Sequence, residues 1–413
     1  MPGKAGGRLQ TIRGFYRNYV KKHYEEAHRF KAQGGRIAWA LSTTPVEILY
    51  AFNFYPVWPE NYSSVCAALQ ASVMLAERAE KQGFSKDLCS YCRIGLGSTF
   101  DPSGAPEGGL PKPDLLVATS CACDIHLKWF QVVSRKLNVP LLFLDVPYNK
   151  SGHPPQGLED YYVKRYVAEL ERMIYFLERF TGTKLDQAKL RRIIELSNEC
   201  SDLWLEVMAY RRAIPCPMGA EDAFSAVFFM LGYAGTEEAV SFYRKLRDEV
   251  KWRVENGIGV LEDERFRLAW DNIPLWYNLG FFDYLKGFGA IVAIESFSLT
   301  WAGSLNPSKP LESLARKHLV NIANSSIDYK KNLFLRLAKE YSLDGVILPL
   351  NWGCKHMSIG EVEVKNELQE KLGVPSLILE VDAADPRGFI EAQVKSKVES
   401  FIELMKQAKQ AKR

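Results

Sequence analysis

Residues 113–145, PDLLVATSCACDIHLKWFQVVSRKLNVPLLFLD, decide the fold class. The stretch holds two short apolar runs, residues 113–119 and 139–145, and between them residues 125–137 place apolar side chains at helical spacing. Buried apolar strands that alternate with helices are typical of a parallel sheet with helices on both faces. The stretch therefore predicts an α/β domain with a doubly wound parallel sheet.

The same alternation extends to both sides of this stretch. Before it, we predict a strand at residues 36–41 and a helix at residues 62–81. The Gly- and Pro-rich residues 97–113 are predicted to form a surface loop. After the stretch come three further strand candidates and a closing helix, at residues 287–294, 344–350, 374–380 and 386–412.

The region between the two α/β regions differs in character, because it contains long amphipathic patterns, such as residues 162–180 and 185–210, and almost no strand-like run. Basic and aromatic residues alternate near the N-terminus, which favours a surface helix packed against the body over a nucleic-acid-binding arm. We predict an N-terminal helical segment, a first α/β domain, a helical subdomain and a second α/β domain with a C-terminal helix, at residues 1–30, 31–157, 158–256 and 257–413.

The composition excludes several classes of protein. Of the 413 residues, 47% are apolar and 25% are charged, which is the usual globular balance. The net charge of +4 is too small to indicate a nucleic-acid partner. The most apolar stretch, residues 223–235, is too short to cross a membrane, and the N-terminus lacks the apolar core of a secretory signal. We expect a cytoplasmic protein that binds neither nucleic acid nor membrane.

The eight cysteines carry the main chemical signal. In a reducing compartment they are better explained as metal ligands, redox groups or core residues than as disulfides. Cys121 and Cys123 directly follow the predicted strand 113–119, and Cys354 follows another apolar run. Ligands of open α/β sheets collect beyond the carboxyl ends of the strands, so these thiols are expected in one interdomain cleft. Thiolates from several loops suit an iron–sulfur cluster or zinc, and the alternative is buried structural cysteines.

The segment after the first predicted strand has two interpretations. Thr44 and Glu47, with Pro45 between them, have the spacing of a capping box at a helix start. The same segment also brings the hydroxyls of Ser42 and Thr43 and the Glu47 carboxylate to the mouth of the expected crevice. In contrast, His126 and Lys128 are expected in solvent or behind the residues that contact a ligand, and not in catalytic positions. No G-x-x-x-x-G-K-[ST] phosphate loop occurs in the sequence, which argues against ATP hydrolysis of the P-loop type.

Several separated motifs, spread over most of the chain, resemble the family of 2-hydroxyacyl-CoA dehydratase and benzoyl-CoA reductase subunits. The motifs are Pro45-Val-Glu47, Pro56-Val-Trp-Pro-Glu-Asn-Tyr62, Leu88-Cys-Ser-Tyr91 with Arg93, Cys123 ahead of Lys128-Trp-Phe130, Asp271-Asn-Ile-Pro274, Gly353-Cys-Lys-His356 and Glu380-x-Asp382-x-x-Asp385-Pro-Arg387. The resemblance implies two flavodoxin-like (Rossmann-like) α/β domains with a helical subdomain between them.

The resemblance also implies a cofactor. One [4Fe–4S] cluster would be held by Cys89, Cys123 and Cys354, with Ser42, Thr43 and Glu47 as the catalytic candidates near its fourth iron. Glu47 would serve in proton transfer if it reaches the substrate. Two additional cysteines, Cys92 and Cys121, lie beside the expected ligands. They leave open a larger double-cubane cluster.

The implied activity is low-potential one-electron reduction of a CoA thioester, either for dehydration or for ring reduction. Residues 56–60 and 128–130 lean toward the branch that resembles benzoyl-CoA reductase. The implied partners are a related subunit or a second copy of the chain, and a separate ATP-hydrolysing iron–sulfur activator. The competing hypotheses are a non-catalytic electron-relay or scaffold subunit, a double-cubane reductase, and a zinc-containing or metal-free α/β protein.

Overall fold

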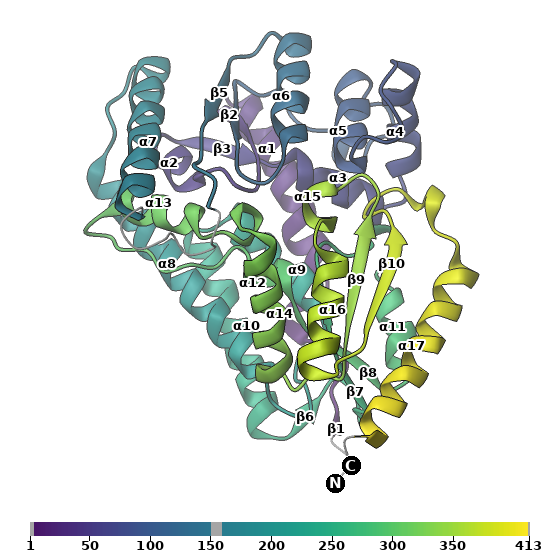
Figure 1. Ribbon diagram of the computed structural model, residues 1–413. Helices are drawn as coiled ribbons and strands as arrows, with labels where there is room; N and C mark the ends of the chain where they lie inside the picture. Colours follow the sequence, from purple (N-terminus) through teal and green to yellow (C-terminus); the bar gives the residue numbers. More distant parts are fainter. Residues whose placement is uncertain (1–3, 150–158, 412–413) are drawn as a thin grey trace.

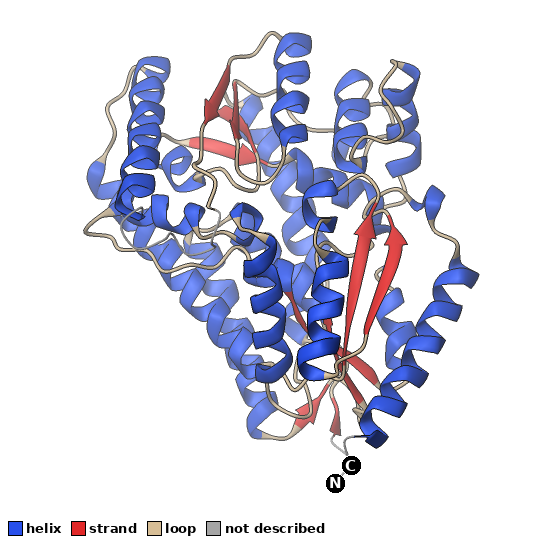
Figure 2. Ribbon diagram, in the orientation of Figure 1, coloured by secondary structure: helices blue, strands red, loops and turns tan. Residues whose placement is uncertain are grey.

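The computed structural model describes residues 4–149 and 159–411 and contains two four-stranded sheets in which every pairing is parallel (Figures 1 and 2). The first sheet has the order β3 (Phe54–Val57), β2 (Arg36–Ala40), β4 (Leu115–Thr119), β5 (Leu141–Leu144). The second sheet has the order β10 (Ser376–Val381), β9 (Gly345–Asn351), β7 (Phe266–Trp270), β8 (Ala290–Glu295). A two-stranded parallel pair joins β1 (Lys4–Ala5) to β6 (Ile258–Gly259).

Both four-stranded sheets have the same topology. Numbered along the chain within each sheet, the strands follow the spatial order 2-1-3-4, which is the flavodoxin-like arrangement. The winding direction reverses between the first and third strands, β2 and β4 in one sheet and β7 and β9 in the other. The predicted α/β fold with two flavodoxin-like domains is therefore confirmed.

The strands form where apolar side chains run without interruption. All five residues of β4 and all six of β8 are buried, as expected for strands covered by helices on both faces. Helix α6 (Asp124–Leu137) contributes Trp129, Phe130 and Val133 to the core beside the first sheet. Further helices around the two sheets are α2 (Val46–Ala51), α11 (Phe281–Lys286), α12 (Ser296–Leu299), α13 (Pro310–Leu319), α14 (Ile327–Glu340), α15 (Lys355–Ser358) and α16 (Glu361–Leu372).

The predicted helical region is observed. It consists of α7 (Glu159–Thr181), α8 (Gln187–Tyr210), α9 (Ala220–Gly232) and α10 (Glu237–Glu255). Arg211, which follows α8, donates hydrogen bonds to Glu295 at the end of β8 at 2.6 and 2.7 Å, and neither side chain is exposed. This fully buried ion pair joins the helical region to the second sheet.

The N-terminal segment packs against the body, as predicted. A helical turn at Tyr16–Lys21 (η2) leads into α1 (Lys22–Ala32), and the Phe15 ring packs edge-on against Phe228 and Phe229 of α9. Phe15 is only 7% exposed, so the segment belongs to the same core as the helical region.

Three predicted elements differ in extent. The helix predicted at 62–81 is two helices, α3 (Pro59–Ala68) and α4 (Ser72–Lys81), because Gln70 between them adopts a φ of 60° that a helix cannot contain. The closing helix, α17 (Glu391–Ala411), begins after a separate turn at Pro386–Gly388 (η6).

The third difference concerns the predicted loop at residues 97–113, whose first residues belong to α5 (Ser90–Phe100). There a Cβ at Gly97 would lie 1.8 Å from the Leu75 carbonyl oxygen, so only glycine permits the close packing of α4 against α5.

In Figure 1 the arrows of β9 and β10 point toward the part of the molecule that holds the first sheet. This arrangement brings the ends of β2 and β4 opposite the ends of β9 and β10. Within residues 4–149 and 159–411, no helix combines the length and apolar character needed to cross a membrane.

Candidate functional site

Each of the three predicted ligand cysteines lies immediately before a helix. Cys123 follows β4 and precedes α6, Cys354 follows β9 and precedes α15, and Cys89 precedes α5. Helix N-termini favour negative charge, but burial acts against the thiolate form at Cys89 and Cys354. Cys123 and Cys354 occupy equivalent places, because β4 and β9 are the third strands of their sheets.

The structure brings these three cysteines to the wall of one cavity of about 90 Å³. Its wall combines residues at the carboxyl ends of strands of both sheets, among them Ser42, Asn351 and Asp382. Both polar atoms of the buried Asn351 side chain have no hydrogen-bond partner among the described residues. Unsatisfied buried polar atoms are costly, so this side chain offers one donor group and one acceptor to any molecule in the cavity.

The thiols influence one another. Burial raises the pKa of Cys89 well above its usual value, and the nearby Cys354 and Cys123 raise it further. Burial, with Cys123 and Asp382, raises the pKa of Cys354 to about 12. A bound cation reverses this effect, since a coordinating thiol is deprotonated outright. The three thiols therefore form a donor set that a positively charged metal group would stabilise.

The spacing of the thiols bears on the kind of metal group. Among residues 4–149 and 159–411, no three His, Cys, Asp or Glu side chains converge closely enough to bind a single metal ion. An iron–sulfur cluster takes each thiolate on a different iron. The three thiols line one cavity and come from separate loops, so each could bind a different iron of such a cluster.

The two additional cysteines are core residues. Cys92 is 3% exposed and packs with Trp39 and Trp129, and Cys121 is 1% exposed and packs with Val117. Neither belongs to the described residues that line the cysteine cavity. Across the chain all eight cysteines are free thiols. The three-thiol set is therefore the one that the cavity presents.

An acidic side chain and a histidine lie beside the thiols. Glu60, the second residue of α3, accepts hydrogen bonds from the Ser42 backbone N–H at 2.6 Å and from the Ser42 hydroxyl at 3.1 Å. His126 Nε2 lies 2.9 Å from Glu60 Oε1, and both side chains are nearly buried. Glu60, Ser42 and His126 all line the cysteine cavity.

The charges of this pair stabilise each other. Burial alone favours the neutral imidazole, but Cys123 and Glu60 outweigh burial and raise the pKa of His126 well above its usual value. Burial likewise favours the neutral Glu60 carboxyl, but His126 and the bonds from Ser42 outweigh it and lower the pKa of Glu60. Both shifts favour the charged forms of this pair, an imidazolium beside a carboxylate.

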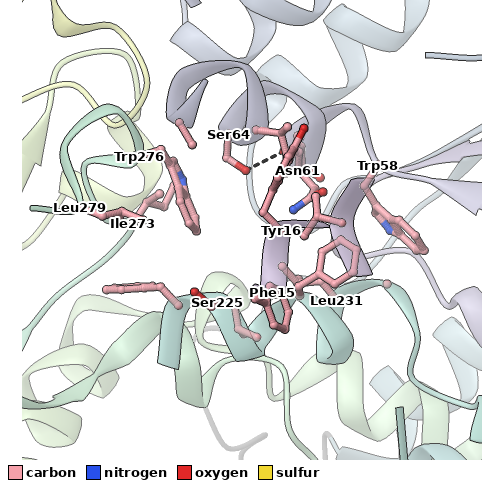
Figure 3. A pocket seen from close by; sticks show the side chains of 18 of the residues that line it. Phe15, Tyr16, Trp58, Asn61, Ser64, Ser225, Leu231, Ile273, Trp276 and Leu279 are labelled. Atoms are coloured by element: carbon pink, nitrogen blue, oxygen red, sulfur yellow. Dashed lines mark hydrogen bonds between the residues drawn. The ribbon is translucent and has the colours of Figure 1, made fainter. Parts of the chain in front are cut away.

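A second, larger cavity of about 560 Å³ adjoins the first. Its wall is mainly apolar and includes several aromatic side chains; Figure 3 shows Trp276 and Trp58 on opposite sides of the space with Phe15 below them. The two cavities share part of their walls, namely Ser42, Glu60, Tyr91, Ile273, Phe297 and Trp301. A molecule in the large cavity would therefore reach Glu60 and the space between the thiols.

The other predicted catalytic residues lie elsewhere. The Thr43 hydroxyl is buried against the Thr119 hydroxyl at 2.6 Å, and Thr43 is absent from the described residues that line these cavities. Glu47 accepts a hydrogen bond from Ser197 at 2.8 Å and pairs with Lys317 at 3.2 Å. Glu47 lines a third cavity of about 30 Å³, which Ser42 also lines. Of the three catalytic candidates, Ser42 alone reaches all three of these cavities among the described residues.

The predicted capping box is wrong. Thr44 Oγ1 accepts a hydrogen bond from the Leu41 N–H at 3.1 Å and donates to the Val117 carbonyl oxygen at 3.3 Å, so it closes the turn after β2. Helix α2 begins at Val46 and receives no side-chain cap. A Thr hydroxyl next to a strand end can satisfy backbone groups of the neighbouring strand instead of the helix, which is what happens here.

An ion-pair network joins the two α/β regions next to the thiols. Arg93 of α5 donates to Glu80 at 2.7 Å, to Asp385 at 2.8 Å and to the Leu88 carbonyl oxygen at 3.0 Å. Asp385 follows β10, so one buried guanidinium links the segment before Cys89 to the second sheet. The pKa of Asp385 is about 2, because Arg387 and Arg93 outweigh the effect of burial.

The sequence pattern does not reveal the pairing of Glu60 with His126. His126 is nearly buried and not solvated, since it stands three residues after Cys123 in the first turn of α6 and lines the cavity. Glu60 follows the short strand β3, which the pattern does not predict. The signal available was that both positions follow the carboxyl ends of strands in the same sheet.

Comparison with known proteins agrees with this geometry. The family model described as "2-hydroxyglutaryl-CoA dehydratase, D-component" matches residues 41–405. The chain is 28% identical to (R)-2-hydroxyisocaproyl-CoA dehydratase alpha subunit of Clostridioides difficile, over 95% of this chain and 96% of that protein. It is 27% identical to (R)-phenyllactyl-CoA dehydratase alpha subunit of Clostridium sporogenes, over 92% of each.

A relative that is named as a reductase subunit also matches, over a smaller share of each chain. A subunit of benzoyl-CoA reductase from Thauera aromatica is 28% identical over 87% of this chain and 86% of that protein. The family model begins just after β2 and covers the rest of the first sheet, the helical region and the second sheet, and it includes all three cavity cysteines. The chain therefore belongs to the family of the 2-hydroxyglutaryl-CoA dehydratase D-component.

Proposed function

We propose that this chain is the iron–sulfur subunit of an enzyme that processes CoA thioesters, of the 2-hydroxyacyl-CoA dehydratase or benzoyl-CoA reductase type. Cys89, Cys123 and Cys354 would hold one [4Fe–4S] cluster. The observation that carries the proposal is that thiols from both α/β regions line one small cavity, and that this cavity adjoins a large apolar one. When bound, the cluster would supply electrons of low potential to the thioester.

The chain's own residues would bind and orient the substrate. The large cavity is lined mostly by aromatic and aliphatic side chains, such as Phe224, Phe228 and Leu279, which favours a thioester with an apolar acyl group. Filling this cavity would expel water from the inner end, where the thiols and Glu60 lie. In a dry site each electrostatic contact is stronger, so the charged groups there would act on the substrate at close range.

Glu60 and His126 would handle the proton. The Glu60 carboxylate accepts hydrogen bonds from Ser42 and pairs with His126, so it is held in a fixed orientation at the border of the two cavities. A buried carboxylate in this position can accept a proton at Oε1 or Oε2 from a bound acyl group. The adjacent His126 imidazolium can donate its own proton to the acyl group, which is a transfer in the opposite direction. We therefore assign the proton transfer to Glu60 and His126 in preference to Glu47.

The relatives support a subunit of a larger assembly, since each of them is named as a subunit of an enzyme. We propose a related subunit or a second copy of this chain as the partner, and a separate ATP-hydrolysing iron–sulfur activator as the electron donor. The sequence has no P-loop motif, which fits this division of labour. Eight free thiols fit a reducing compartment such as the cytoplasm.

The test is iron and sulfide analysis of the chain after anaerobic purification. We expect about four irons and four sulfides per chain in the wild type, and a loss of most of both in Cys354→Ala. The matched control is Cys200→Ala, because Cys200 is a buried thiol of α8 outside the cavity. Wild-type protein without iron, or Cys354→Ala with the full content, would contradict the proposal.

A further inference from the structure

A buried lysine lies behind the segment that carries Cys354. Lys330 belongs to α14, and its side chain is only 14% exposed. Its ammonium nitrogen lies 2.7 Å from Asp271 Oδ2 and 3.2 Å from Glu361 Oε1. Both acidic residues are 1% exposed. One cation and two acids are thus enclosed together at the end of the second sheet.

The third partner of this lysine is backbone. Lys330 Nζ donates to the Met357 carbonyl oxygen at 3.0 Å, and the Ile359 carbonyl oxygen lies further away at 3.5 Å. The ammonium thus donates hydrogen bonds to Glu361 and to the Met357 carbonyl oxygen and forms an ion pair with Asp271. Met357 is the third residue of α15, the short helix that directly follows Cys354, and it lines the cysteine cavity.

The two acidic partners of Lys330 lie at the end of a strand and at the start of a helix. Asp271 directly follows β7, and its other oxygen accepts a hydrogen bond from the Ser296 hydroxyl. Glu361 is the first residue of α16, after Gly360, whose φ of 89° is a conformation that favours glycine. The Cys354 segment therefore lies between two rigid elements, and Lys330 joins it to both.

We propose that Lys330 is a positioning residue for Cys354, because its ammonium, held by Asp271 and Glu361, binds the Met357 carbonyl and fixes the segment that carries the thiol. The role of Cys354 as a cluster ligand rests on the proposed function, whereas the fixing of the segment is a property of the chain without metal. On its other side the segment is tied to β9, since the Ser358 hydroxyl accepts from the Asn351 N–H at 2.9 Å and donates to the Asn351 carbonyl oxygen at 3.1 Å.

Charge balance within the group supports this role. Burial and the neighbouring Asp271 carboxylate raise the pKa of Glu361 to about 10. A neutral Glu361 can donate its proton to Asp271, which gives a partner to Glu361 Oε2, an oxygen that otherwise has none among the described residues. The charges of Lys330 and Asp271 then cancel. The three enclosed side chains together carry no net charge and can remain buried.

The experiment measures the alkylation rate of each cysteine in metal-free protein by mass spectrometry. In Lys330→Met we expect Cys354 to react at least ten times faster than in the wild type, while Cys89 and Cys123 on the first α/β region change less than twofold. The matched control is Lys331→Met, because Lys331 is the next residue of α14 and contacts the exposed Asp328 at 2.9 Å. This control should leave Cys354 at the wild-type rate.

Two further variants separate positioning from general damage. Glu361→Gln should keep the slow Cys354 rate, since the amide accepts from Lys330 and donates to Asp271 as the neutral acid does. If Lys330→Met does not fold, Glu361→Ala carries the same test, and Cys354 should then react at least three times faster. A Cys354 rate within twofold of the wild type in folded Lys330→Met, or in Glu361→Ala, overturns the proposal.

Iron retention after anaerobic loading gives a second readout. Lys330→Met should retain less than half of the iron that the wild type and Lys331→Met retain. If the wild type takes up no iron while the alkylation pattern holds, the proposed function fails and the positioning role of Lys330 stands. If the wild type is loaded and Lys330→Met matches it in both readouts, the positioning role fails alone.

Discussion

His126 Nε2 lies 2.9 Å from Glu60 Oε1 in the wall of the cysteine cavity, and Glu60 also lines the large apolar cavity. Neither residue is one of the three cysteines proposed to bind the cluster. The pair lies where a molecule in the large cavity would approach the three thiols. This relationship makes the pair the centre of the proposed proton transfer, and its removal gives the first prediction.

Glu60→Gln should lower turnover by about 10²-fold to 10⁴-fold, because the amide cannot accept the proton. Iron content should stay at the wild-type level, since the three thiols are unchanged. The control is Glu25→Gln, whose side chain is 59% exposed on α1. Turnover of Glu60→Gln within a factor of three of the control would contradict the assignment.

Ser225→Trp should weaken the binding of acyl-CoA by more than tenfold, because the indole would fill part of the large cavity that Ser225 lines. Binding is measured by calorimetry with the metal-free chain, so the result does not depend on turnover. Ser241→Trp, at an exposed position of α10, should bind as the wild type does. Unchanged affinity in Ser225→Trp would show that the acyl group lies elsewhere.

Arg93→Met should lower the free energy of unfolding by about 2 kcal/mol, since bonds to the buried carboxylates of Glu80 and Asp385 are lost. Arg387 still pairs with Asp385 at 2.6 Å and limits the loss. The matched control is Arg212→Met. It removes an exposed ion pair with Glu340, which should lower the free energy of unfolding by less than about 1 kcal/mol. Equal losses in the two variants, measured by urea unfolding, would argue against a buried link between the α/β regions.

Stability should fall as the pH falls below about 6.5, and His23 should account for part of this. Burial lowers the pKa of His23 to about 3, so the folded state keeps the ring neutral while the unfolded state takes up a proton near its ordinary value of about 6.5. Between these values the group removes about 1.4 kcal/mol of stability per pH unit of acidification, and the loss is absent at higher pH. In His23→Gln the unfolding free energy should depend less steeply on pH in this window. Parallel curves for variant and wild type would contradict this assignment.

The sequence predicts a strand where its buried residues form an unbroken apolar run. The prediction fails for a strand that buries a charged side chain held by polar contacts. Strand β4 and most of β8 are apolar at their buried positions, so their pattern suffices. Strand β7 contains Arg267, which is buried because the carbonyl oxygens of Tyr341 and Arg211 and the carboxylate of Glu264 accept its donors. Two of those partners come from distant parts of the chain, so no local pattern indicates this strand.

The same distinction holds for the site. Cys123 and Cys354 could be located from the sequence because each follows a recognisable strand. Glu60 and His126 could not be paired, since their contact depends on how β3 and β4 are arranged around β2. The distance of Glu47 from β2 in sequence predicts a place at the crevice, but the turn closed by Thr44 directs it toward Ser197 and Lys317.

In the proposed function, three thiols hold a four-iron cluster at the inner end of the substrate cavity, which leaves one iron without a thiolate ligand. The most direct measurement is the Mössbauer spectrum of the ⁵⁷Fe-loaded chain with an acyl-CoA thioester, with free CoA and without either. We predict that the thioester changes the signal of one iron site in four and that free CoA changes none. A spectrum that neither compound changes would make the cluster a relay or structural group, and would contradict the assignment of the substrate to this cavity.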